Sequence, residues 1–224
     1  MSVCLNLFVS LRLLMSKVLL FWSSGKDSAM AYQRLVAEGF SVAALITTTR
    51  PEGRVPFHEV PFRAVVDQAR AIGLPLWRLP LPHPCPNTLY ESLVGEVLRQ
   101  ARQQGFTHVA FGDLFLTDIR AYRIQLVEKC GLEALFPVWL DAPEASAAYA
   151  RSVLQTGTRA IVTAVDTSRL PADLVGEPYD EAFLERLPAD VDPAGEYGEF
   201  HTFVQVAPFF RFSVPLSPYL PHAR

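Results

Sequence analysis

The 224-residue sequence has few cysteines, and they are far apart. Cys4, Cys85 and Cys130 form no Cys-x-x-Cys pair and no Cys/His spacing typical of a metal site. We interpret them as three reduced thiols of a cytoplasmic protein. Cys85 lies in His-Pro-Cys-Pro-Asn, a segment expected to be a loop, and no other feature marks it as a nucleophile.

The sequence also lacks a large excess of either positive or negative charge. Twenty Lys and Arg residues stand against 23 Asp and Glu, which gives a formal net charge of −3, and no run of five like charges occurs. Proteins that bind nucleic acid usually show a basic excess or stripe. The composition therefore argues against a nucleic-acid partner, but not against a small anionic ligand, which needs only a few local donors.

No segment is long and apolar enough to suggest a membrane span. The first sixteen residues, MSVCLNLFVSLRLLMS, are apolar but shorter than the roughly 20 residues that a span needs. They also lack the basic start and small-residue cleavage site of a secretory signal. We interpret residues 1–16 as an N-terminal extension before a natural start at Met15, with an N-terminal helix as the alternative. No membrane partner is expected.

Half of the residues are hydrophobic, and their spacing alternates between that of strands and that of helices. Strands are expected at 18–22, 41–46, 75–79, 108–111 and 159–165, with helices at 28–38, 62–72, 88–104, 118–130 and 142–155. Glycine follows each of the five helices. This alternation predicts an α/β fold with a parallel sheet covered by helices on both faces.

Ligands of such sheets bind beyond the carboxyl ends of the strands. This rule points to residues 23–28, 47–50, 80–87, 112–118 and 165–169. After Leu170 the alternation breaks: a short helix at 180–187 and a glycine-rich segment at 195–202 precede a strand at 203–206.

The stretch VLLFWSSGKDS, residues 18–28, is the clearest candidate for a phosphate-binding turn. A Walker A loop is excluded, because Lys26 is followed by Asp27 and the first-glycine position is Leu20. A buried strand that runs into small residues and a helix N-terminus nevertheless attracts anions. The candidate ligands are Ser23, Ser24, Gly25, Lys26, Asp27 and Ser28. In the alternative, Asp27 or Ser28 only caps the helix and Lys26 is solvated.

Residues 23–28 resemble the pyrophosphate loop Ser-Gly-Gly-x-Asp-Ser of the N-type ATP pyrophosphatases, which are adenine nucleotide alpha hydrolase-like. From Lys17 to about Pro208 the chain resembles the diphthine–ammonia ligase family, in its bacterial branch. The motifs that carry this resemblance are Phe57-His58-Glu59, Pro84-Cys85-Pro86, Phe111-Gly112-Asp113-Leu114-Phe115, Asp118-Ile119-Arg120-Ala121-Tyr122-Arg123, Phe136-Pro137-Val138-Trp139 and Gly195-Glu196-Tyr197-Gly198-Glu199-Phe200-His201-Thr202.

The resemblance implies a Rossmann-like (HUP-type) ATP-binding domain over residues 17–169 and a smaller, substrate-side portion over 170–224. It also implies an ATP-dependent, AMP-forming amide ligase that uses ATP and Mg²⁺. A carboxylate is adenylated, pyrophosphate leaves, and ammonia then displaces AMP. The expected partners are a small-molecule or protein-borne carboxylate and ammonia, and a homodimer is compatible with the sequence.

The resemblance also suggests site residues. Lys26 would be the pyrophosphate anchor, and Asp27 and Asp113 would hold Mg²⁺. Thr47, Gly112, Arg120 and Arg123 would contact the nucleotide. The alternatives are that Asp113 caps a helix or turn and that the two arginines form a solvated face with Asp118. Ser24 replaces the first glycine of the family loop, which costs energy if its φ is positive.

Glu196, Glu199 and His201 form a second cluster of candidate catalytic residues. Two acids and a histidine among glycines are poorly explained by folding alone. They could orient ammonia, bind a cationic part of the substrate, or accept a proton from attacking ammonium, for which His201 has a suitable unperturbed pKa. His58, and Thr47 to Thr49, are weaker candidates to face a ligand.

Two other functions stay open. A tRNA-modifying relative would adenylate through the same loop, but such enzymes often carry paired cysteines or basic extensions. A non-catalytic nucleotide-binding module would leave the segment 195–202 without a purpose.

Overall fold

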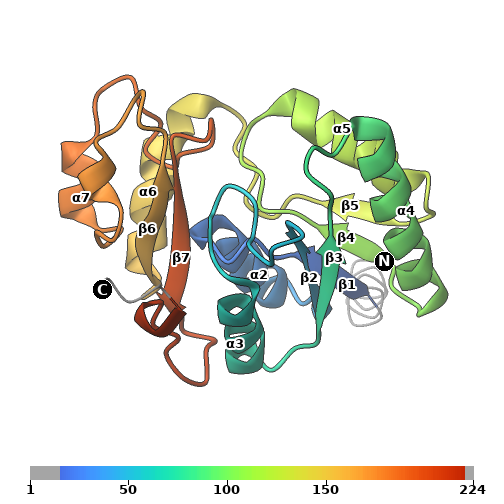
Figure 1. The fold of residues 1–224 in the computed structure, drawn as a ribbon. Helices are drawn as coiled ribbons and strands as arrows, with labels where there is room; N and C mark the ends of the chain where they lie inside the picture. Colours follow the sequence, from blue (N-terminus) through green and yellow to red (C-terminus); the bar gives the residue numbers. More distant parts are fainter. Residues whose placement is uncertain (1–15, 220–224) are drawn as a thin grey trace, which may run out of the picture.

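The computed structural model describes residues 16–219, and a five-stranded parallel sheet lies at its centre (Figure 1). The strands are β1 (Lys17–Phe21), β2 (Ser41–Thr49), β3 (Leu76–Pro80), β4 (His108–Ala110) and β5 (Glu133–Leu135). They lie in the order β3-β2-β1-β4-β5, and all neighbouring pairs are parallel. The predicted α/β fold is confirmed. Because the order reverses between β1 and β4, a crevice is expected beyond their carboxyl ends.

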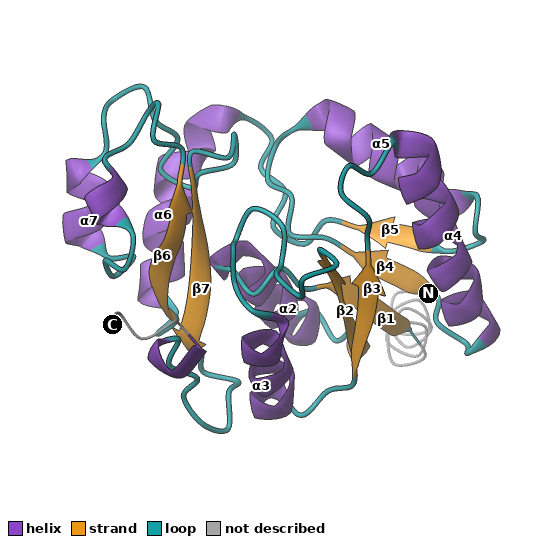
Figure 2. Cartoon of the chain, in the orientation of Figure 1, coloured by secondary structure: helices purple, strands orange, loops and turns teal. Residues whose placement is uncertain are grey.

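Helices cover both faces of this sheet (Figure 2). They are α2 (Lys26–Ala37), α3 (Phe62–Ile72), α4 (Asn87–Gln103) and α5 (Thr117–Glu128). Val18 and Leu20 belong to the same buried cluster as residues of α2 and α3, whereas Leu19 packs with residues of α4 and α5. Successive side chains of a strand point to opposite faces, so the continuous apolar run of β1 is buried on both sides.

A second, antiparallel sheet lies beside the α2 and α3 face (Figure 1). It pairs β6 (Arg159–Val165) with β7 (Phe200–Val206), and α6 (Ser146–Gln155) and α7 (Glu181–Arg186) accompany it. Short 3₁₀ turns occur at Pro143–Ala145, Ala172–Leu174 and Ser217–Tyr219.

The expectation that residues 159–165 extend the parallel sheet is therefore wrong. β6 is only partly buried, which suits an antiparallel sheet with one covered face better than a strand buried on both sides. The predicted domain boundary between residues 169 and 170 falls between the two paired strands, and it stays a prediction.

Other differences from the predicted elements are local. β5 was missed because three residues are too few to show a period. β2 continues to Thr49, so Thr47 lies inside a strand and not in a loop. The five glycines expected after helices all have positive φ, between 72° and 87°, and this prediction is confirmed.

Two predictions concern residues that the structure does not describe. The N-terminal extension lies outside the described residues except for Ser16, and so does Cys4.

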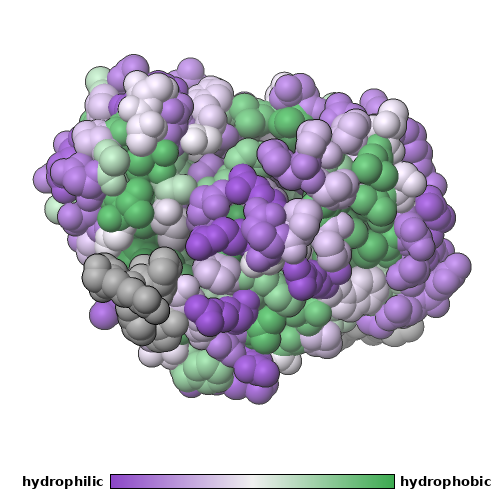
Figure 3. All heavy atoms as spheres, viewed as in Figure 1, coloured by the Kyte–Doolittle hydropathy of each residue, from purple (hydrophilic) through white to green (hydrophobic). Residues whose placement is uncertain are grey.

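Within residues 16–219, no helix is both long and apolar enough to cross a membrane. On the face drawn in Figure 3, hydrophilic residues gather at the centre between more apolar areas.

Candidate functional site

A cavity of about 670 Å³ lies at the carboxyl ends of β1, β2 and β4, where the strand order reverses. Its walls come from the loop after β1, the turn before α3, the segment after β4, and residues 194–196 and 200–202. Ten of the predicted site residues line it: Ser23, Lys26, Asp27, Ser28, Thr47, Gly112, Asp113, Arg123, Glu196 and His201. The remaining four, Ser24, Gly25, Arg120 and Glu199, do not.

The loop after β1 ends in a helix whose first turn faces this cavity. Gly25 is the N-cap of α2, and neither Asp27 nor Ser28 caps it. Lys26 is 2% exposed, so it is not solvated. The alternative in which Asp27 or Ser28 caps the helix and Lys26 is solvated is therefore wrong. Within residues 16–219, the backbone N–H groups of Asp27 and Ser28 have no hydrogen-bond acceptor, as expected for the first turn of a helix.

Ser24 has φ +78°, which resolves the question its replacement of glycine raised. Its side chain is completely buried, and its hydroxyl has no hydrogen-bond partner among the described residues. The serine therefore fits in the left-handed conformation that favours glycine, and it adds no donor to the cavity.

The loop is hydrogen-bonded to β7. Val204 N–H donates to the Ser24 carbonyl at 2.9 Å, and Lys26 N–H donates to Thr202 Oγ1 at 3.1 Å. The buried Gln68 of α3 completes the connection, because its Nε2 donates to the carbonyls of Val204 at 2.7 Å and Ser24 at 3.2 Å. Its Oε1 accepts the indole N–H of Trp22. The backbone of the loop is thus fixed by groups from two elements, β7 and α3.

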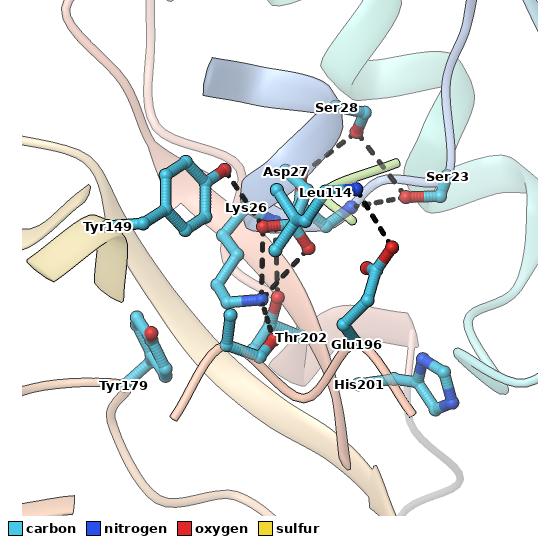
Figure 4. Close-up of polar contacts among 12 residues, drawn as sticks. Ser23, Lys26, Asp27, Ser28, Leu114, Tyr149, Tyr179, Glu196, His201 and Thr202 are labelled. Atoms are coloured by element: carbon cyan, nitrogen blue, oxygen red, sulfur yellow. Dashed lines mark hydrogen bonds and ion pairs between the residues drawn. The ribbon is translucent and has the colours of Figure 1, made fainter. Parts of the chain in front are cut away.

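Lys26 and Asp27 interact with each other (Figure 4). Lys26 Nζ lies 2.9 Å from Asp27 Oδ2, and it also donates to the carbonyl of Ala194. Tyr149 of α6 donates its hydroxyl proton to Asp27 Oδ1 at 3.0 Å. Burial and the Asp27 carboxylate raise the pKa of Tyr149 well above its usual value, so the phenol stays a donor. The Asp27 carboxylate is held from both sides.

Gly112 allows the segment after β4 to approach this loop. A Cβ on Gly112 would lie 3.0 Å from the backbone of Asp27 and Ser28. The next residue, Asp113, forms an ion pair with Arg123, with 2.7 Å between Oδ2 and Nε. The Arg123 guanidinium also lies over the Phe111 ring, 4.4 Å from its centroid. Asp113 is therefore neither a helix cap nor a free carboxylate.

The two arginines of α5 do not act as a pair. Arg123 lines the cavity, whereas the Arg120 guanidinium stacks over Trp139 at 4.4 Å and over Phe136 at 5.2 Å. Three-residue spacing placed both on one helix side, but aromatic residues of the following segment cover Arg120. The alternative of a solvated face with Asp118 does not hold for Arg123 either, because Arg123 is paired with Asp113.

Glu196 and Glu199 have different surroundings. Glu196 faces the cavity, and its Oε1 accepts the N–H of Leu114 at 2.8 Å. Burial, with smaller contributions from Asp27 and Asp113, raises the pKa of Glu196 to about 8. Glu199 is 1% exposed, and its Oε1 accepts the N–H of Asp192 at 3.0 Å and a hydrogen bond from Arg169 at 3.3 Å. Glu199 thus fixes the shape of the segment 192–199.

His201 lies next to a second histidine. The ring of His201 is 4.9 Å from that of His58, and both line the cavity. Burial lowers the pKa of His201 to about 3, with further contributions from His58 and Lys26. The unperturbed pKa that suggested a proton acceptor near neutral pH does not apply at this site.

Several residues that build the site carried no sequence signal of their own. Tyr149 and Gln68 are ordinary members of amphipathic helices, and Asp192 lies in an acidic, proline-containing stretch. Their partners lie 122, 136 and 7 residues away for Tyr149–Asp27, Gln68–Val204 and Asp192–Glu199. Thr202 was visible only as the end of the motif 195–202, which gave no hint of its contact with the loop.

A comparison with known families bears on the part of the chain that carries β7. Residues 145–219 match the family model of the diphthamide synthase C-terminal domain. The match covers about a third of the chain. It contains Glu196, His201 and Thr202, which line the cavity, and Tyr149, which donates to Asp27. The match supports the resemblance to the diphthine–ammonia ligase family. A search of curated proteins gave no match.

The matched region begins at residue 145, directly before α6 and before the predicted domain boundary, and the loop of residues 23–28 lies outside it. Within residues 16–219, no three or more His, Cys, Asp or Glu side chains are grouped so that they could hold a metal ion by themselves. Cys85 also lines the cavity, and Cys130 is buried.

Proposed function

We propose that the protein is an ATP-dependent amide ligase of the diphthine–ammonia ligase type. In this reaction a carboxylate attacks the α-phosphate of ATP, pyrophosphate leaves, and ammonia displaces AMP to give an amide. Membership of the bacterial branch of that family belongs to the same proposal, and so does the assignment of residues 23–28 as a loop of the N-type ATP pyrophosphatases.

One observation carries it. The loop after β1 and the segment 194–202, which are about 170 residues apart in sequence, line one cavity and are hydrogen-bonded to each other. The second segment lies inside the region that matches the diphthamide synthase C-terminal domain. A phosphate-binding loop that faces the most distinctive segment of that region favours a nucleotide-dependent reaction over nucleotide binding alone.

The residues of the loop fit a phosphate group. The N–H groups of Asp27 and Ser28 are available, and the positive end of the α2 dipole favours an anion. At Gly25 a Cβ would lie 2.7 Å from His58 and 3.1 Å from the carbonyl of Thr202, so only glycine leaves the backbone room here. Lys26 would hold the leaving pyrophosphate through its charge.

The candidate ligands for Mg²⁺ are fewer than the groups that fit a phosphate. Asp27 is the better candidate ligand, because its carboxylate is 25% exposed and lines the cavity. Asp113 would have to share its carboxylate with Arg123. Mg²⁺ commonly takes one or two carboxylates and completes its shell with phosphate oxygens and water. The ion would neutralise phosphate charge, and the protein would contribute Asp27 first.

Glu196 is the candidate acid–base group of the cavity. With a pKa of about 8, its carboxyl group is mostly protonated at neutral pH and can donate a hydrogen bond to an oxygen of the substrate. Glu199 would act by holding Glu196 and the segment around it in place. A carboxylate acceptor would then lie between Glu196 and the loop.

The test is the formation of AMP from ATP labelled at the α-phosphate, with Mg²⁺, ammonium and a panel of carboxylic acids. We expect AMP and pyrophosphate to form with a subset of acids in the wild type, and to fall at least about a hundredfold in Lys26→Ala. Lys129→Ala is the matched control, since Lys129 is exposed and does not line the cavity.

Four results would contradict this function. ADP and phosphate as the products would mean cleavage at the γ-phosphate. Equal rates in wild type and Lys26→Ala would remove the loop from the reaction. ATP binding without turnover in the presence of every acid would favour a non-catalytic nucleotide-binding module, and tRNA that co-purifies and is modified would favour the tRNA-modifying alternative.

A further inference from the structure

The fixed cations of the cavity are all paired with carboxylates in the described part of the chain. Lys26 lies 2.9 Å from Asp27, Arg50 lies 2.8 Å from Glu59, and Arg123 lies 2.7 Å from Asp113. Glu196 adds a further acid. A phosphate chain with several negative charges would enter a site whose lysine and arginine charges are already compensated, so a further group that becomes positive would strengthen its binding.

His58 is placed to be that group. Its Cε1 atom lies over Gly25, where it would come within 2.7 Å of an added Cβ. Its Nδ1 lies 2.9 Å from the carbonyl oxygen of Thr202, the residue whose hydroxyl holds the N–H of Lys26. The imidazole thus adjoins the backbone that would bind phosphate, and it lines the same cavity.

The turn that carries His58 has a strained backbone that contacts from two arginines hold in place. Phe57 and Glu59, on either side of it, both have positive φ, at 65° and 55°, which is costly for residues other than glycine. Arg54 donates to the carbonyl of Glu59, and Arg50 pairs with its carboxylate. These contacts hold the strained turn, and with it the position of the imidazole.

In the free protein His58 is neutral. Burial, with a smaller contribution from Lys26, lowers the pKa of His58 to about 4, although the hydrogen bond to Thr202 acts in the opposite direction. Because a carbonyl can only accept, the single ring proton lies on Nδ1, and Nε2 is unprotonated. Lys26 of α2 is the charged group that acts on the ring, the Glu59 carboxylate of the same turn is paired with Arg50, and the neighbouring titratable ring is His201 of β7.

We propose that His58 is a ligand of the phosphate group bound by the loop of residues 23–28, and that it takes up a proton at Nε2 when this anion binds. The inference rests on the proposed phosphate-binding role of that loop. An anion beside a histidine favours its charged form. His201 stays neutral, because two imidazolium rings 4.9 Å apart would repel each other. The ligand class is a di- or triphosphate, free or as part of a nucleotide.

Ring ¹⁵N chemical shifts of the five histidines, measured at pH 7 with inorganic pyrophosphate and no metal, test this directly. We expect His58 to be a neutral Nδ1–H tautomer in the free protein and an imidazolium in the complex. The ¹⁵N shifts report the protonation state of each histidine ring separately. Protons that pyrophosphate itself gains or loses on binding therefore do not affect the result. His58→Asn should weaken pyrophosphate binding about tenfold or more. His83→Asn, also on the cavity wall, should bind like the wild type.

A His58 ring that stays neutral in the saturated complex would overturn the inference, as would His58→Asn binding with wild-type affinity. A proton found on His201 in place of His58 would also overturn it. If pyrophosphate binds the wild type but not Lys26→Ala while His58 stays neutral, the loop keeps its proposed role and only this inference fails. If the wild type binds no pyrophosphate, the phosphate-binding loop itself fails.

Discussion

Ser24 combines two unfavourable features at one residue. Its φ of +78° lies in the left-handed region, which costs roughly 1–2 kcal/mol for a residue with a Cβ. Its buried hydroxyl has no partner within residues 16–219, which adds a desolvation cost of about 1–3 kcal/mol. Glycine would remove both costs and lose about 0.5–1 kcal/mol through greater freedom of the unfolded chain.

Ser24→Gly should therefore raise the free energy of unfolding by about 1 kcal/mol, measured by urea denaturation. Ser24→Ala is the matched control, since it removes the hydroxyl but keeps the Cβ in a left-handed conformation. The glycine variant should be the more stable of the two. A glycine variant less stable than the alanine variant would show that the positive φ carries no cost here.

Glu196 makes stability depend on pH. Its folded pKa of about 8 lies above the usual value of 4.5, so the folded state holds a proton that the unfolded state has released between these pH values. Stability is accordingly complete below pH 4.5 and declines as the pH rises towards 8. Glu196→Gln lacks this loss and keeps an oxygen for the Leu114 N–H.

Urea denaturation at pH 5, 7 and 9 checks this. The difference between Glu196→Gln and wild type should be small at pH 5 and reach about 1–3 kcal/mol in favour of the variant at pH 9. Glu96→Gln, an exposed change on α4, should show no such trend. A difference for Glu196→Gln that is constant with pH would mean that the carboxyl is not perturbed by burial.

At the scale of elements, α3 holds the loop of residues 23–28 against β7 through Gln68. The amide satisfies the indole N–H of Trp22 at 2.8 Å and the carbonyl of Val204 at 2.7 Å, and it is completely buried. β1, its following loop and β7 are thereby fixed relative to one another. β1 and β7 belong to different sheets and are not paired with each other. The Gln68 side chain and the hydrogen bonds of Thr202 and Val204 therefore determine the geometry of the loop.

Gln68→Leu should lower the free energy of unfolding by roughly 2–5 kcal/mol, because the Trp22 N–H and the Val204 carbonyl are left buried without a partner. Thermal and urea denaturation measure this loss. Gln100→Leu, on the exposed side of α4, is the control and should change stability by less than about 0.5 kcal/mol. Equal stability of the two variants would show that the amide has no role in joining the loop to β7.

At the scale of the whole molecule, the sequence predicted the parallel sheet and the placing of most candidate residues on one cavity. Both follow from local patterns: the apolar run of β1, the glycines after helices, and the rule that ligands bind at carboxyl ends of parallel strands. The strand order reverses between β1 and β4, and the cavity lies beyond the carboxyl ends of these two strands, as the rule predicts. Lys26 is buried at this place.

What the sequence did not predict depends on contacts between distant segments. The pairing of Asp113 with Arg123, the stacking of Arg120 on Trp139, and the inward turn of Glu199 all require the tertiary fold. The short β5 and the second sheet were missed for a related reason, since three residues show no period and a half-buried strand does not reveal its partner.

The central claim is that the loop of residues 23–28 binds the phosphates of ATP in the cavity that it shares with β7. Isothermal titration calorimetry of ATP with the wild type, Lys26→Ala and Lys129→Ala tests it most directly. We expect Lys26→Ala to weaken ATP binding by about ten- to a hundredfold, through loss of its charge-assisted bonds, and Lys129→Ala to bind like the wild type. Equal affinity of all three proteins for ATP would contradict the account.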